Sequence, residues 1–63
     1  MFIQLTDQDG KLRLINFDRV DYISPVMNGK NTSIFFSGQV LPFITDESYE
    51  EVKEILNMAG LYK

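Results

Sequence analysis

Apolar and polar residues alternate along most of the chain, and this two-residue period is typical of β-strands with one buried face. In residues 1–6, Ile3 and Leu5 fall on one face, which we expect to be the buried one. The same period recurs along the chain, so we predict about five short strands. Their ranges are 1–6, 11–16, 20–24, 32–37 and 40–44.

The position of each residue in the alternation predicts whether its side chain faces the core or the opposite side of the sheet. We expect the inner face to carry apolar residues from three of the strands, namely Ile3, Leu5, Leu12, Leu14, Ile34 and Phe36. Phe2, Ile15 and Phe35 then point to the opposite face.

Turn-forming residues separate the strands. Residues 7–10, Asp-Gln-Asp-Gly, favour a turn because Asp bonds to nearby backbone and Gly accepts positive φ. The dipeptide Asn28-Gly29 is the strongest short hairpin signal. Because Pro has no N–H, we predict that Pro25 ends the third strand and that Pro42 places the fifth strand at a sheet edge.

The period changes to that of an amphipathic helix near the end of the chain. Ser48 and Glu51 fit a capping box, in which each side chain accepts a hydrogen bond from the other residue's N–H. An apolar stripe follows at helical spacing, formed by Tyr49, Val52, Ile55, Leu56 and Ala59. Gly60 is suited to the left-handed conformation that ends a helix.

These elements predict an α+β fold: a small antiparallel sheet of about five strands followed by one C-terminal helix, in a single domain over residues 1–63. The helix supplies the second layer that covers one face of the sheet. A strongly curled, barrel-like sheet is an open alternative.

Several short motifs match those of a known family: residues 1–6 (MFIQLT), 14–16 (LIN), 20–23 (VDYI) and 47–52 (ESYEEV), together with Gly10-Lys11. Over nearly the whole chain this order resembles the FlbD family of small bacterial proteins linked to flagellar operons. The resemblance implies no catalytic residues. The CsrA-type RNA-binding regulators are similar in layout only, with five short strands, a helix and dimers formed by interleaved strands.

The composition limits the chemistry. The 63 residues contain no Cys and no His, which removes disulfides and the usual zinc, iron–sulfur and haem ligands. A Ser or Tyr nucleophile would need a Lys base, and no such pair is suggested by the spacing. We read Asp7-x-Asp9-Gly10 as a turn, because the further ligands of a calcium loop do not follow. We therefore expect no enzyme, no cofactor and no metal.

The charge pattern argues against nucleic-acid binding. The formal net charge is −3, and the basic residues are scattered. Nucleic-acid binders usually carry clustered Lys and Arg. A small nucleic-acid-binding regulator of CsrA-like layout remains the alternative function, and it would use Lys11, Arg13, Arg19 and Lys30.

The apolar content exceeds what a lone chain of this size is expected to hide. Small domains usually need a staple, and self-association is the one left here. We predict a non-enzymatic protein–protein interaction module that forms a homo-oligomer, most simply a dimer, with another protein as a possible partner. Its contact residues would be Phe2, Ile15, Phe35, Val40 and Phe43. The start lacks a signal-peptide pattern and no window spans a bilayer, so we expect a cytoplasmic protein. Its pathway is unassigned, with a flagellar-operon-like or a mobile-element protein as examples.

Overall fold

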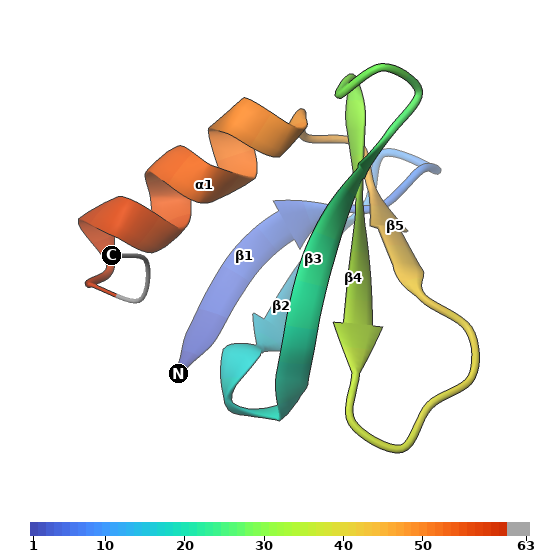
Figure 1. Ribbon diagram of the computed structural model, residues 1–63. Coiled ribbons are helices and arrows are strands. Elements are labelled where there is room, and N and C mark those ends of the chain that lie inside the picture. Colours follow the sequence, from blue (N-terminus) through green and yellow to red (C-terminus); the bar gives the residue numbers. More distant parts are fainter. Residues whose placement is uncertain (61–63) are drawn as a thin grey trace.

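The computed structural model describes residues 1–60. It has five antiparallel strands in two small sheets, followed by one helix (Figure 1). The first sheet pairs β1 (Phe2–Thr6) with β2 (Leu12–Asn16). A 3-10 turn, η1 (Phe17–Arg19), leads to the second sheet, whose order is β3 (Val20–Val26), β4 (Asn31–Phe36) and β5 (Phe43–Thr45). The helix α1 (Tyr49–Met58) completes the α+β fold that the sequence predicted. The sheets do not close into a barrel, so the barrel-like alternative is wrong.

The Asp7 side chain organises the loop between β1 and β2. Its Oδ1 accepts the N–H of Asp9 at 2.9 Å and that of Lys11 at 2.9 Å. Its Oδ2 accepts the Nε–H of Arg13 at 2.8 Å. Gly10 adopts a φ of 82° and donates to the Asp7 carbonyl. The predicted turn is confirmed, and it is built around a buried carboxylate.

The register of this hairpin places Ile15 in the core and turns Leu12 and Leu14 outward. Ile15 lies opposite Ile3 and is 8% exposed, whereas Leu12 and Leu14 are 66% and 68% exposed. The predicted inward orientation of the two leucines is therefore wrong, as is the outward orientation of Ile15. The cause is the loop 7–11, which leaves Thr6 opposite Leu12, so that odd-numbered residues of both strands share the inner face.

The second sheet differs from its predicted bounds at two places. β3 continues through Pro25, which lies in register with Thr32. Because β3 is an edge strand, the missing N–H of Pro25 is tolerated there. Residues 37–42 form a connecting loop rather than the start of β5, which begins at Phe43. Pro42 thus lies outside the strand.

Three local signals are confirmed. Asn28 and Gly29 adopt positive φ values of 57° and 85° in the turn between β3 and β4. The hydroxyl of Ser48 accepts the Glu51 N–H at 3.1 Å, and the Glu51 carboxylate accepts the Ser48 N–H at 2.9 Å. Gly60 follows the helix with a φ of 79°.

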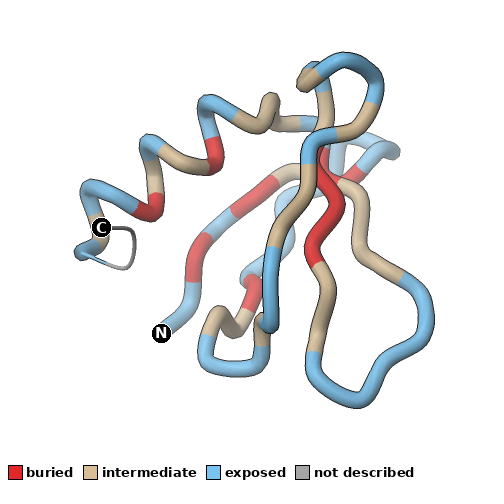
Figure 2. The backbone as a smooth tube through the Cα atoms, in the orientation of Figure 1, coloured by how far each residue is buried: buried red, intermediate tan, exposed pale blue. Residues whose placement is uncertain are grey.

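The core lies between the two sheets and α1, and its buried positions run along β1, β4 and the inner side of the helix (Figure 2). Its buried apolar residues are Ile3, Leu5, Ile15, Ile34, Val52 and Leu56. Partly buried residues pack around them, including Phe17, Val20, Ile23, Phe36, Phe43, Ile55 and Ala59. The core is small, which is why the arrangement of the remaining apolar side chains matters.

A polar junction joins the two sheets at one end. Both carboxylate oxygens of Glu47 accept the N–H of Thr6, at 2.9 and 3.0 Å. The Asp46 N–H donates to the Thr6 carbonyl at 2.7 Å. The hydroxyls of Thr32 and Thr45, both fully buried, donate to the Glu47 carbonyl. At its Thr6 end, the second edge of β1 is therefore occupied by the segment that connects β5 to α1.

Candidate functional site

The outer face of the β1–β2 hairpin carries large apolar side chains. Phe2, Leu12 and Leu14 all lie on this face, and each is more than 60% exposed. Leu14 is diagonal to Phe2 across the two strands, because Phe2 pairs with Asn16. A solvent-facing sheet surface is normally polar. We call Phe2, Leu12 and Leu14 the hairpin patch.

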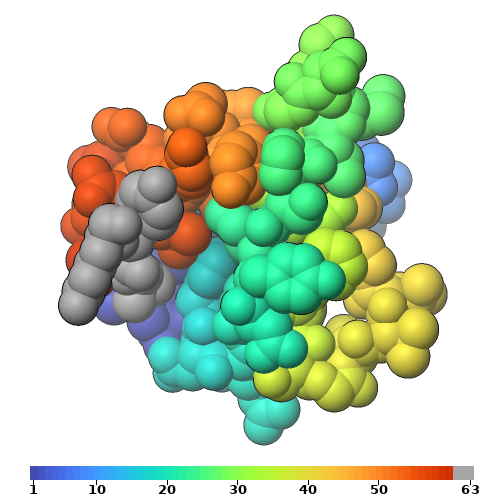
Figure 3. All heavy atoms as spheres, viewed as in Figure 1, coloured from blue at the N-terminus to red at the C-terminus, as the bar shows by residue number. Residues whose placement is uncertain are grey.

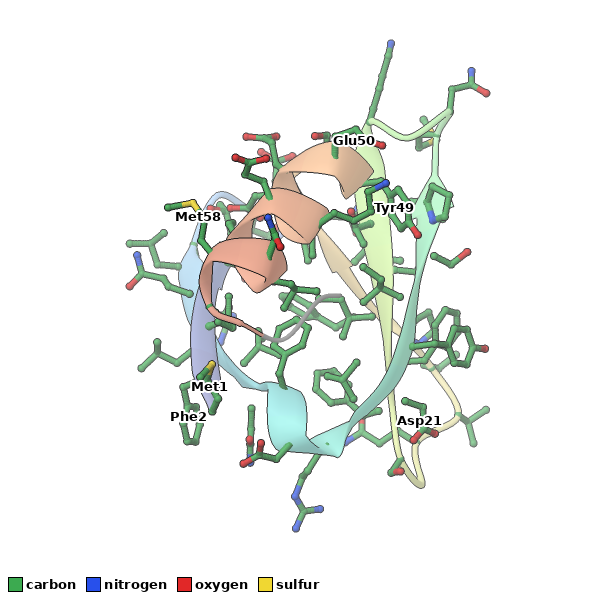
Figure 4. The ribbon with its side chains drawn as sticks, turned by 60° about the vertical axis from the view of Figure 1, so that its left-hand side comes forward. Met1, Phe2, Asp21, Tyr49, Glu50 and Met58 are labelled. Carbon is green, nitrogen blue, oxygen red and sulfur yellow. The ribbon has the colours of Figure 1, made fainter. Side chains whose placement is uncertain are left out.

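Two methionines extend the apolar character of this side of the molecule. Met1 is 46% exposed and Met58, in the last turn of α1, is 80% exposed. Figure 4 shows both on the same side as Phe2, whose ring points away from the body of the protein. Contiguous exposed apolar surface on a small protein usually marks a contact with another molecule.

The hairpin patch borders a strand edge without a partner. Among residues 1–60, β2 pairs with β1 alone. The Asp7 N–H bonds the Lys11 carbonyl and the Phe17 N–H bonds the Met1 carbonyl, each at 2.8 Å. Odd-numbered pairs are therefore the hydrogen-bonded pairs of this antiparallel ladder. It follows that the even-numbered residues of β2 direct their backbone N–H and C=O groups toward the open edge.

The structure separates the five predicted contact residues. Phe2 belongs to the hairpin patch, but Ile15 is a core residue and Phe43 packs partly buried against the core. The sequence reasoning missed Leu12 and Leu14. The signal that would have found them is the loop 7–11, since its length sets the register and hence the face of every residue in β2.

The other two predicted contact residues lie on the second sheet and its loop. Phe35 is half-buried and stacks on Tyr22, with ring centroids 4.4 Å apart and planes at 15°. Val40 is 92% exposed and Leu41 is 78% exposed in the loop 37–42, which projects from the molecule (Figure 3). These loop residues are apolar, but no strand pairing holds them in a defined array.

A groove of about 360 Å³ runs between β3 and α1. Its charged side chains already have partners. Asp21 accepts the Ser37 hydroxyl at 2.7 Å, and the Lys53 ammonium lies 3.3 Å from the Glu50 carboxylate and 5.2 Å from the centre of the Tyr49 ring. The groove therefore presents mainly aliphatic and aromatic walls.

The four basic residues of the alternative function do not form one cluster. Arg13 is bound to Asp7, and Lys11 lies in the adjoining loop. Arg19 belongs to η1, at the end of the molecule opposite to the β3–β4 turn that carries Lys30 (Figure 1). This distribution gives no continuous positive surface for a phosphate backbone.

The contacts of Asp7 shift the titration of its carboxyl group. The hydrogen bond from the Arg13 side chain, followed by the backbone bond from Lys11, lowers the pKa of Asp7 below its usual value despite partial desolvation. Within residues 1–60, no three Asp or Glu side chains are grouped to hold a metal ion. No helix there is long and apolar enough to cross a membrane.

Comparison with protein-family models, with curated proteins and with solved structures finds no match for this chain. The resemblance to the FlbD family and the layout shared with CsrA-type regulators therefore stay predictions from the sequence.

Proposed function

We propose that this chain is a non-enzymatic protein–protein interaction module that self-associates as a homodimer through the hairpin patch. The observation that carries the proposal is the presence of Phe2, Leu12 and Leu14 on one exposed face of two paired strands. Exposed apolar arrays of this kind are typical of contact surfaces.

The size of the expected effect follows from the patch. Fully burying a side chain such as Leu or Phe contributes about 1.5–3 kcal/mol, and association costs about 4–15 kcal/mol in lost freedom. Even complete burial of the three residues of each copy, each about two-thirds exposed at the start, gives a gain only of the same order as that cost, so this gain is an upper bound. Because gain and cost are similar, the net free energy of association is small, and we expect a weak dimer whose population rises with protein concentration.

Sedimentation over a concentration series tests the proposal. Wild-type protein should approach twice the 7.3 kDa chain mass as concentration rises. Leu14→Asp should stay at the monomer mass, because a charge in the centre of the hairpin patch opposes burial. Val40→Asp is the matched control on the loop 37–42 and should behave as wild type.

A circular dichroism spectrum of each variant checks that it is folded. A wild-type chain that remains monomeric at every concentration would contradict self-association. Dissociation by Val40→Asp but not by Leu14→Asp would move the contact from the hairpin to the loop 37–42.

The nucleic-acid alternative is tested by retention on RNA and DNA at several salt concentrations. Binding that falls steeply with salt would favour it, because phosphate contacts release counterions. With a net charge of −3 and dispersed basic residues, we expect no such binding. The flagellar or mobile-element pathway and the cytoplasmic location stay predictions.

A further inference from the structure

The open edge of β2 carries a short, regular row of backbone groups. Leu12, Leu14 and Asn16 direct their N–H and C=O groups away from β1, as the odd-numbered ladder requires. The strand contains no Pro, no Gly and no bulge. Such an edge is a template for another strand unless something covers it.

This row is complementary to itself. If a second β2 approaches antiparallel about a two-fold axis through Leu14, Leu14 faces its own copy and Leu12 faces Asn16 of that copy. All the facing residues direct their backbone groups toward the partner, so each pair exchanges both N–H···O bonds. A two-fold axis is the commonest symmetry of homodimers.

We propose that two copies join by antiparallel pairing of β2 with β2, centred on Leu14, so that their hairpins form one continuous four-stranded sheet. The proposal rests on the self-association proposed above and specifies its edge and its register. Leu14 then packs beside Leu14 of the copy on the outer face, while Phe2, one strand further out, flanks the joined surface.

The charges near the edge favour this register over the one centred on Arg13. A register shifted to centre on Arg13 would place two arginines directly opposite each other, which is destabilising. The register centred on Leu14 sets Arg13 against Ile15 of the copy. It also brings the end of β2 near Lys11 toward the end of the copy near Asp18, whose carboxylate binds the N-terminal amine of its own chain at 2.7 Å and is 74% exposed.

Hairpin dimensions also favour pairing through the edge. A two-stranded ribbon is only marginally stable by itself, and a sheet of more strands is better stabilised. In this fold the first sheet has two strands, and the second edge of β1 is bound at its Thr6 end to Asp46 and Glu47. Within residues 1–60 the edge of β2 has no such partner along its length, so it is the edge at which we expect this sheet to grow.

Single-cysteine variants test the register, because the natural chain has no cysteine of its own. In Leu14→Cys the two sulfur-bearing residues face each other with Cα atoms about 5.5 Å apart, within the range of a disulfide. Residue 12 lies on the same strand and face. In Leu12→Cys the Cα atoms of the two cysteines, one from each chain, are ~13 Å apart, which is too far for a disulfide. Val40→Cys reports random collision from a fully exposed site.

Under mild oxidation we expect Leu14→Cys to form covalent dimer at least about tenfold faster than either control, since pairing raises the effective concentration of the two thiols. A mixture of tagged Leu12→Cys with untagged Asn16→Cys should give a mixed disulfide while retaining Leu14. This second measurement covers the case in which loss of the leucine itself weakens the dimer.

The outcomes separate the two proposals. A wild-type dimer in which neither Leu14→Cys nor the Leu12→Cys and Asn16→Cys mixture cross-links preferentially overturns the edge pairing and leaves self-association standing. Equal cross-linking of Leu14→Cys and Leu12→Cys would indicate face-to-face packing of the hairpin patch and would also overturn it. A wild-type monomer in sedimentation overturns both.

Discussion

Two of the edge strands, β2 and β3, differ in the features that control pairing at their open edges. β3 contains Pro25, which offers no N–H, and its register shifts between Val20 and Tyr22. The helix α1 also packs beside it, across the groove. Proline, bulges and a covering helix are three established ways to prevent edge pairing. β2 has none of these three features, and its outer face carries the exposed Leu12 and Leu14 beside Asn16.

This difference shows that a small protein can protect one edge and leave another available. The protected edge is irregular in backbone, whereas the available edge is regular and short. Because β2 is regular, open and apolar on its outer face, we expect a further strand to pair at its edge and not at the edge of β3. Substitutions in either strand therefore test whether the two edges differ in this way.

The largest effect is expected at the inner face of β2. Ile15→Ala should lower the free energy of unfolding by about 2–4 kcal/mol, because it leaves a cavity among buried residues. Leu14→Ala should change it by less than about 0.5 kcal/mol in the monomer, because Leu14 is a surface residue. Urea denaturation at low protein concentration measures both changes in the free energy of unfolding. A larger loss for Leu14→Ala than for Ile15→Ala would contradict the register of the hairpin.

A smaller effect, on self-association, is expected from replacing Pro25, whose missing N–H protects the edge of β3 from pairing. Pro25→Val supplies a backbone N–H and a residue that favours strands. We expect the sedimentation mass at high concentration to rise above that of wild type, because a second edge becomes competent to pair. Ser24→Val, at the neighbouring position, adds apolar surface without changing the backbone donors and serves as the control. An unchanged mass for Pro25→Val would show that the bulge and α1 suffice to block β3.

The smallest effect concerns the charge pair beside β2. The pKa of Asp7 is lower in the folded protein than in the unfolded chain, so its charged form adds stability that is complete above the unfolded pKa of about 3.9. That contribution is lost as the pH falls through the lowered folded pKa. Asp7→Asn should remove this part of the acid dependence, as thermal unfolding between pH 5 and pH 2 would show. An unchanged acid profile would indicate that other carboxylates dominate.

Local signals in the sequence were sufficient for most of the elements. The capping box of Ser48 and Glu51, the helix end at Gly60 and the turn at Asn28-Gly29 each depend on neighbouring residues only. Such interactions are encoded within a few positions of the chain. The helix and the turn at Asn28-Gly29 were therefore predicted at the right places, whereas the loop 37–42 was predicted too short.

The face of β2 could not be read from alternation alone. Residues 12–15 read Leu-Arg-Leu-Ile, so either phase offers an apolar residue to the core. The face of each β2 residue depends on the loop 7–11, which the hydrogen bonds of Asp7 hold at five residues. This loop length sets which residue of β2 pairs with which residue of β1. Pro25 was misread for a similar reason, because its tolerance depends on the edge position that the topology gives to β3.

The junction at Thr6 makes one backbone amide a reporter of how the two layers separate. Because the Thr6 N–H is held by Glu47 and not by β2, its hydrogen exchanges with solvent when the segment before α1 moves away from β1. The Leu5 amide, which belongs to the ladder with β2, exchanges only when the hairpin itself opens. The ratio of these two exchange rates, measured on one protein sample, distinguishes separation of the segment before α1 from β1 from unfolding of the β1–β2 hairpin.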